Sequence, residues 1–104
     1  MSQGVVAGGL VYLAGQVADN TNADVKGQTA EVLAKIDAVL AKAGSGKAKL
    51  LSVTIYLKDI KDFAAMNQVW DTWVAADGKP ARVTVQAALA TPAYLVEIQA
   101  IALL

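Results

Sequence analysis

The feature that most constrains the fold is the alternation of apolar and polar residues between positions 80 and 102, near the end of the chain. Side chains in a β-strand point alternately to the two faces of a sheet, so this stretch predicts two strands joined by a short turn. In the first strand, the two faces are Val83, Val85, Ala87 and Leu89 against Arg82, Thr84, Gln86 and Ala88. In the second, they are Val96, Ile98, Ala100 and Ala102 against Leu95, Glu97, Gln99, Ile101 and Leu103.

Arg82 and Glu97 are the strongest functional signal in these strands. Arg82 is the only arginine of the chain, and Glu97 is one of two glutamates. If the apolar faces of both strands lie on one side of the sheet, Arg82 and Glu97 share the other side. A guanidinium can bind a carboxylate through two parallel hydrogen bonds, and a carboxylate can serve as a general base. Two interpretations remain open: the two residues act on a ligand, or they pair with each other and neutralise a buried seam.

Composition removes several classes of function. Nine lysine and arginine residues balance nine aspartate and glutamate residues, which gives no electrostatic basis for binding nucleic acid or a membrane surface. The chain has no cysteine and no histidine, which excludes a cysteine nucleophile, a Ser-His-Asp triad and zinc sites built from these ligands. A calcium or magnesium site made only of carboxylates stays possible, but no acidic cluster has the loop spacing that it needs. We expect neither a metal nor an organic cofactor.

The first eighteen residues carry no charge but are interrupted by Gly4, Gly8 and Gly9. A signal peptide would begin with basic residues, and glycines at this density disfavour a membrane helix. We therefore expect two strands here. The lack of cysteine leaves the redox compartment undecided, and a cytoplasmic location is the default expectation. Gly15, at the end of the second strand, predicts a bulge or a close backbone approach, with a plain strand end as the open alternative.

Periodicity and turn residues predict the remaining elements. The expected strands are residues 3–7, 10–14 and 50–57, and the expected helices run from about 23 or 24 to 43 and from about 60 to 75. Gly8-Gly9 forms the turn between the first two strands. The expected core faces are Thr29, Val32, Leu33, Ile36, Val39 and Leu40 in the first helix, Leu51, Val53, Ile55 and Leu57 in the third strand, and Phe63, Met66, Trp70 and Trp73 in the second helix.

The order strand-strand-helix-strand-helix-strand-strand predicts an α+β fold in a single domain over residues 1–104, with both helices on one face of a mainly antiparallel sheet. The other sheet face is expected to carry Tyr12, Tyr56, Leu95, Ile101 and Leu103 beside Thr54, Arg82, Gln86, Glu97 and Gln99. This face is too apolar to sit in water, and 56% of all residues are hydrophobic, above the usual share. We therefore expect it to pack against copies of the chain.

Three segments in order resemble the RidA/YjgF family of small trimeric proteins that hydrolyse enamines and imines. They are Gly15-Gln16-Val17, Lys58-Asp59-Ile60-Lys61-Asp62-Phe63-Ala64-Ala65-Met66-Asn67, and Ala81-Arg82 with Val96-Glu97-Ile98-Gln99-Ala100-Ile101-Ala102. Together they span nearly the whole chain. The short bacterial YoaB-like subgroup is the most similar, on the cues Met66-Asn67 before Trp70-Asp71-Thr72-Trp73, and Leu89, Pro92 and Tyr94 before Val96-Glu97-Ile98.

The resemblance implies a chorismate-mutase-like subunit, three of which pack their sheets into a homotrimeric barrel with ligand clefts between subunits. It implies an imine deaminase (a hydrolase of 2-imino acids or enamines) in which Glu97 is catalytic and positions the attacking water. The substrate-binding residues that it implies are Arg82, which binds the substrate carboxylate, with Gly15, Gln16, Thr84 and Ala14.

The chain also departs from the family pattern. Ala14 replaces a serine, Ala18 a proline and Thr84 a cysteine, and the N-terminal pocket tyrosine of the family has no counterpart. These changes keep a second class of function open, a non-catalytic trimeric module that binds small carboxylates or 2-keto acids. A nuclease is disfavoured by the balanced charge and the absence of histidine.

Overall fold

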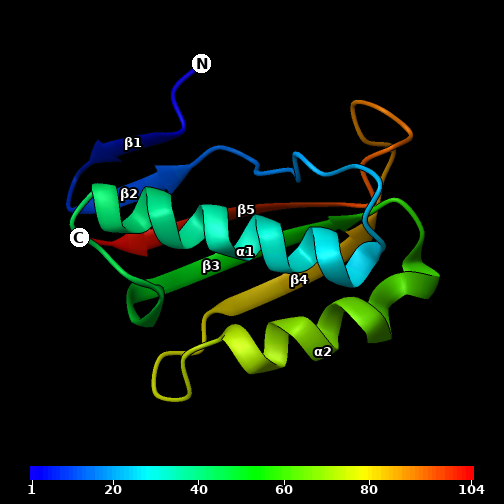
Figure 1. Cartoon of the computed structure of the whole chain (residues 1–104). Coiled ribbons are helices and arrows are strands. Elements are labelled where there is room, and N and C mark those ends of the chain that lie inside the picture. The colour runs from blue at the N-terminus through cyan, green and yellow to red at the C-terminus, as the bar shows by residue number, and fades with distance from the viewer.

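A five-stranded sheet carries two helices on one of its faces in the computed structural model, which describes residues 1–104 (Figure 1). The elements in chain order are β1 (Gly4–Ala7), β2 (Leu10–Leu13), α1 (Val25–Lys42), β3 (Leu50–Leu57), α2 (Phe63–Trp73), β4 (Ala81–Gln86) and β5 (Val96–Leu103), with short 3₁₀ turns at Lys47–Lys49 and Ile60–Asp62. The predicted fold class and element order are confirmed. No helix has both the length and the apolar character needed to cross a bilayer.

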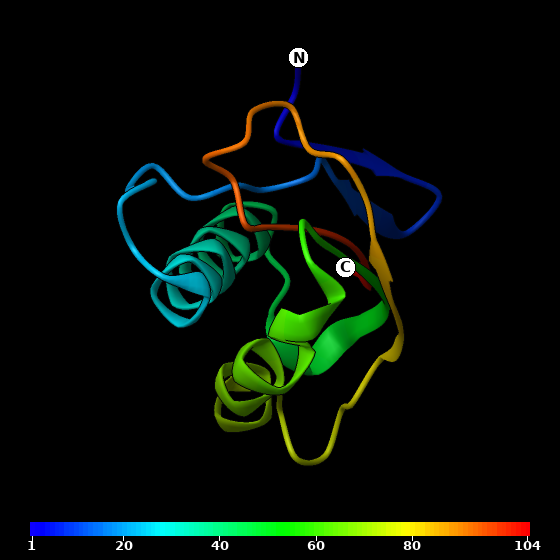
Figure 2. The same ribbon diagram turned by 90° about the vertical axis from the view of Figure 1, so that its right-hand side faces the viewer.

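The strands lie in the order β1-β2-β5-β3-β4. All neighbouring pairs are antiparallel except β3 and β4, which are parallel because α2 forms a crossover between them. The prediction that β4 and β5 are joined by a short turn is wrong, since β3 lies between them. Residues 87–95 instead arch over the end of the sheet, as the orange segment in Figure 2 shows.

Local sequence explains where the first helix begins and ends. The Asp24 side chain accepts a hydrogen bond of 2.8 Å from the backbone N–H of Gly27 and caps α1. Gly44 follows the last turn with φ +81°, a left-handed conformation that glycine adopts without strain. Asp59 accepts from the N–H of Lys61 and starts a 3₁₀ turn, so α2 itself begins three residues later than expected.

The core fills the space between the two helices and the inner face of the sheet. Its fully buried members include Val11, Leu13, Val32, Leu33, Ile36, Leu40, Val53, Ile55, Leu57, Met66 and Ile98. Burial of each large aliphatic side chain contributes roughly 1.5–3 kcal/mol. The predicted stripe of α1 is confirmed, with Val39 partly buried at its margin.

The register of β4 differs from the prediction in a way that matters for function. Arg82 is paired with Val53 and Thr84 with Ile55, and directly paired residues point to the same sheet face. The polar residues of β4 therefore face the helices, while Val83 and Val85 lie on the helix-free face, 57% and 42% exposed. Alternation suggested the opposite because nothing within one protomer buries the apolar side of this edge strand.

Three further side chains depart from their expected places. A bulge between Leu50 and Ser52 turns Leu50 into the core and leaves Leu51 exposed. Leu95 packs against the core instead of lying on the helix-free face. Phe63 is 40% exposed, whereas Met66 and Trp70 are buried and Trp73 packs at the core margin. The predicted core face of α2 is thus correct for three of its four residues.

Substitution of Trp70 tests whether α2 packs on the core through this residue. The residue is 6% exposed, and its ring centroid lies 5.5 Å from that of Trp73. Trp70→Ala should lower the free energy of unfolding by about 3–5 kcal/mol, because the substitution leaves a large cavity. Urea denaturation measures this change, and Phe63→Ala, which truncates an exposed ring of the same helix, should cost clearly less. Unchanged stability of Trp70→Ala would show that this packing is wrong.

Candidate functional site

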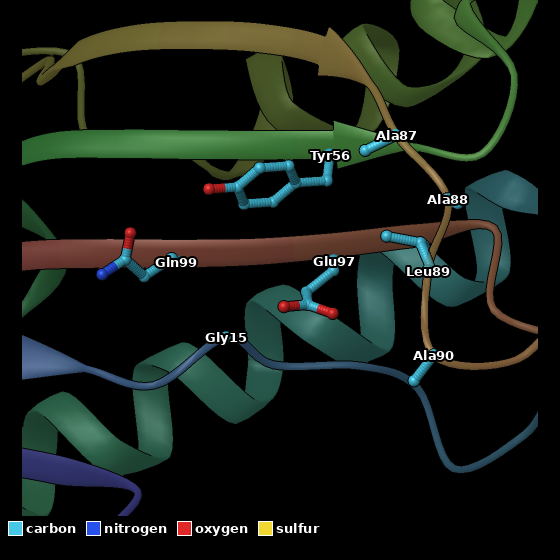
Figure 3. A pocket seen from close by; sticks show the side chains of 8 residues that line it. All are labelled: Gly15, Tyr56, Ala87, Ala88, Leu89, Ala90, Glu97 and Gln99. Carbon is cyan, nitrogen blue, oxygen red and sulfur yellow. The ribbon is translucent and has the colours of Figure 1, made fainter.

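A cavity of about 470 Å³ opens on the helix-free face of the sheet, at the end where residues 87–95 cross it (Figure 3). Tyr56 of β3 and Glu97 and Gln99 of β5 form its floor. Gly15 lies along one side, and the apolar residues 87–90 form the wall at one end. The cavity therefore combines one carboxylate with a phenol, an amide and an apolar wall, a composition suited to a small polar molecule.

Glu97 lies against the backbone of Gly15. A Cβ atom built on Gly15 would lie 2.9 Å from the carboxyl carbon of Glu97, so any other residue at this position would require the Glu97 side chain to move. The next residue fixes this approach, because the backbones of Gln16 and Ile98 exchange hydrogen bonds of 2.8 and 3.1 Å. The close backbone approach predicted for Gly15 is confirmed. The Glu97 carboxylate itself takes part in none of the side-chain hydrogen bonds or ion pairs of the protomer.

Arg82 lies on the opposite face of the sheet, under α2. Its Nη1 donates a 2.8 Å hydrogen bond to Oδ1 of Asn67, and its guanidinium carbon lies 5.1 Å from the ring centroid of Trp70 and 5.7 Å from that of Phe63. Partial burial lowers the pKa of Arg82 from its ordinary value, and the carboxylate of Asp71 opposes this effect. An arginine keeps its charge through such a shift.

The structure thus corrects the expected arrangement of the two central residues. Arg82 and Glu97 do not share a sheet face, because Arg82 is paired with inward-facing Val53 and Glu97 with outward-facing Tyr56. They form no ion pair in the protomer. The interpretation that they neutralise each other is therefore wrong for a single chain.

The other predicted site residues lie at the cavity, beside Arg82 on the inner face, or at neither location. Gly15 lines the cavity with Glu97. Thr84 lies on the inner face two residues from Arg82, and its Oγ1 is the one buried side-chain oxygen or nitrogen atom that lacks a hydrogen-bond partner. Ala14 and Gln16 do not line the cavity: the Gln16 amide is 6% exposed and donates to Oε1 of Gln3 and to the carbonyl oxygen of Ala14.

Sequence reasoning did not assign site roles to Asn67, Trp70, Tyr56 or Gln99. A signal for the first two was present, because Asn67 and Trp70 are three residues apart and share one helix face. The strand alternation placed Tyr56 and Gln99 on the face of Glu97, but it could not show that they border a common cavity. No group of three or more histidine, cysteine, aspartate or glutamate side chains is arranged to hold a metal ion.

Comparisons with known proteins match the whole chain. The profile of the family described as endoribonuclease L-PSP matches residues 1–104. The RutC family protein YoaB of Escherichia coli is 51% identical over 98 residues, covering 94% of this chain and 85% of the relative. A RutC family protein of Pyrococcus horikoshii is 39% identical over 107 residues, covering 97% of this chain and 84% of the relative.

Solved structures agree with the sequence matches. A crystal structure of a YjgF family member from Neisseria meningitidis superposes with a TM-score of 0.96 at 50% identity, covering 99% of this chain and 86% of that one. A member of the YjgF/YER057c/UK114 family from Mycobacterium tuberculosis gives a TM-score of 0.90 at 30% identity, covering 100% and 86%. The chain therefore belongs to the endoribonuclease L-PSP family, the RidA/YjgF family that its sequence motifs indicate.

Proposed function

We propose that the chain forms a homotrimer that binds small 2-imino or enamino acids in clefts between subunits and hydrolyses them to 2-keto acids and ammonia. The observation that carries this proposal is that Glu97 and Arg82 both lack an ion-pair partner within the protomer. Glu97 is an unpaired carboxylate in a cavity, and Arg82 is a guanidinium without an ion pair on the opposite face. Charged groups that have no ion-pair partner within the protomer are free to bind the charged or polar groups of a ligand.

The site would be assembled from two copies of the chain. Because Arg82 and Glu97 of one protomer lie on opposite faces, a small ligand that touches both must take them from different subunits. β4 is an edge strand, so a neighbouring copy packed along it can approach Arg82. The helix-free face offers the surface for such packing, with Val5, Tyr12, Val83, Val85 and Leu103 each at least 41% exposed. Cyclic symmetry would then repeat the same cleft at every interface.

The reaction requires only these two residues and water. Arg82 would bind the substrate carboxylate through two parallel N–H···O hydrogen bonds and so fix the position of the adjacent imine carbon. Glu97 would accept a proton from water as the water oxygen bonds to that carbon, and would then pass the proton to the nitrogen. The resulting carbinolamine would then give its hydroxyl proton to Glu97, which would pass it to the nitrogen. As the carbon–nitrogen bond breaks, its electron pair leaves with ammonia and the carbon–oxygen bond becomes the carbonyl of the 2-keto acid.

The alternative is a trimeric module that binds small carboxylates without turning them over. The alanine at position 14, the alanine at 18 and the threonine at 84 favour it, since these replace family serine, proline and cysteine. Release of ammonia from a freshly generated imino acid separates the two functions. The endoribonuclease description of the family has no support in the composition of this chain, which lacks histidine and carries zero formal net charge.

The trimer is the first expected outcome. Multi-angle light scattering at micromolar concentration should give about three times the 10.8 kDa chain mass. Burial of the exposed valines of β4 is the physical reason, so Val85→Lys should weaken assembly while Lys61→Gln, a change at an exposed position away from that face, should not. A wild-type mass of one chain would contradict both the trimer and the shared cleft.

Arg82→Lys tests the carboxylate anchor. The substitution keeps the positive charge but loses the planar fork, so the affinity for 2-oxobutyrate, a short 2-keto acid, should fall about tenfold or more. Isothermal titration calorimetry measures it. Because the variant has the same net charge as the wild type, a loss of affinity cannot come from a change in long-range electrostatic attraction. Full affinity in Arg82→Lys would place the site elsewhere.

Glu97→Gln separates hydrolysis from binding. The amide keeps the shape of the side chain but cannot accept the proton of water, so kcat should fall by roughly 10²–10⁴-fold while 2-oxobutyrate still binds. An amino-acid oxidase generates the imino acid, and semicarbazide competes for it as a trap. Equal rates for the two proteins, with intact oligomers, would remove Glu97 from the mechanism. A wild-type rate no higher than background would favour the binding module.

A further inference from the structure

Tyr56 is placed to act together with Glu97. The two residues are directly opposite each other in the β3–β5 ladder, and Gln99 is the diagonal neighbour of Tyr56. Directly opposed residues have Cβ atoms about 4.5–5.5 Å apart, and diagonal pairs at about 7–8 Å remain within reach of aromatic and long side chains. All three side chains line the same cavity, so a phenol, an amide and a carboxylate border one small space.

The polar ends of these side chains have no partners in the protomer. Neither the Tyr56 hydroxyl nor the Gln99 amide takes part in a side-chain hydrogen bond of the chain, and the same holds for the Glu97 carboxylate. Figure 3 shows the Tyr56 ring lying along the sheet surface, with its hydroxyl directed toward the Gln99 end of the cavity, while Glu97 points toward Gly15. None of these atoms is among the buried polar atoms that lack a partner, so solvent reaches them and they are free to bind water or a ligand.

We propose that Tyr56 is a positioning residue that, with Gln99, holds the attacking water against Glu97. This inference rests on the hydrolytic function proposed above. The water would donate one hydrogen to the Glu97 carboxylate and the other to Oε1 of Gln99, and would accept a hydrogen bond from the Tyr56 hydroxyl. These three contacts satisfy the usual number of partners of a bound water and leave one lone pair free to attack the imine carbon.

The competing explanation is that Tyr56 only contributes apolar area to the face that packs against other copies. Tyr12 supplies a matched comparison, because it lies on the same face, is paired with Ile101, and does not line the cavity. Removal of a hydroxyl leaves the ring and its apolar area in place. Tyr56→Phe therefore separates a polar role from a packing role, and Tyr12→Phe controls for the loss of a tyrosine hydroxyl from this face.

The experiment compares wild type, Tyr56→Phe, Gln99→Leu and Tyr12→Phe in three measurements. The first is kcat and KM for the imino acid that an oxidase generates from L-leucine, with semicarbazide as the trap. The others are the affinity for 2-oxobutyrate and the oligomer mass. We expect kcat of Tyr56→Phe and of Gln99→Leu to fall roughly three- to tenfold, the effect of losing one neutral hydrogen bond. Affinity and mass should not change, and Tyr12→Phe should match wild type throughout.

The outcomes distinguish this inference from the function on which it rests. A wild-type kcat in Tyr56→Phe, in an enzyme that Glu97→Gln disables, would overturn the role of Tyr56 alone. So would an equal loss of kcat in Tyr12→Phe, or a fall in Tyr56→Phe that is accompanied by loss of the oligomer. A wild-type protein that releases no ammonia above the oxidase background would overturn the hydrolytic function and this inference together.

Discussion

The parallel pairing of β4 with β3 is the constraint on which the arrangement of the site depends. It places Arg82 beside Val53 and Thr84 beside Ile55, and so turns the only arginine of the chain toward α2. The antiparallel pairing of β5 with β3 places Glu97 beside Tyr56 on the opposite face. A shift of β4 by one residue would exchange its faces, since side chains alternate with a period of two. The register therefore decides that one protomer cannot bring its arginine and its glutamate to the same ligand.

Arg82 and Glu97 have different surroundings on the two faces of the sheet. On the inner face, the Arg82 guanidinium donates a hydrogen bond to Asn67 and lies over the rings of Trp70 and Phe63. Cation–π contacts of this kind contribute about 0.5–2 kcal/mol. On the outer face, Glu97 occupies the space that a side chain at position 15 would need. The contacts of the guanidinium fix its position, and preorganisation of this kind reduces the entropic cost of binding.

The sequence predicted the elements and their order because helical and strand periodicities are local signals. It also identified Gly15 as a place of close approach, and Arg82 and Glu97 as the residues most worth examining. It failed at β4, where Val83 and Val85 point away from the core of their own chain. The alternation of apolar and polar residues shows which side chains avoid water but not what covers them. A strand face that packs on another copy of the chain therefore has the same sequence pattern as a face that packs on a helix. Likewise, no local pattern encodes the hydrogen bond between Asn67 of α2 and Arg82 of β4, or the position of Tyr56 opposite Glu97.

The central claim is that Arg82 and Glu97 act on one ligand from different subunits, and mixed oligomers test it most directly. Arg82→Ala and Glu97→Gln proteins, each expected to be strongly impaired alone, would be unfolded together, refolded, and assayed for ammonia release from the imino acid. In statistically mixed trimers of cyclic symmetry, about one site in four combines the intact arginine of one variant with the intact glutamate of the other. The account predicts that the mixture recovers about that share of wild-type activity, whereas a mixture as inactive as its components would contradict it.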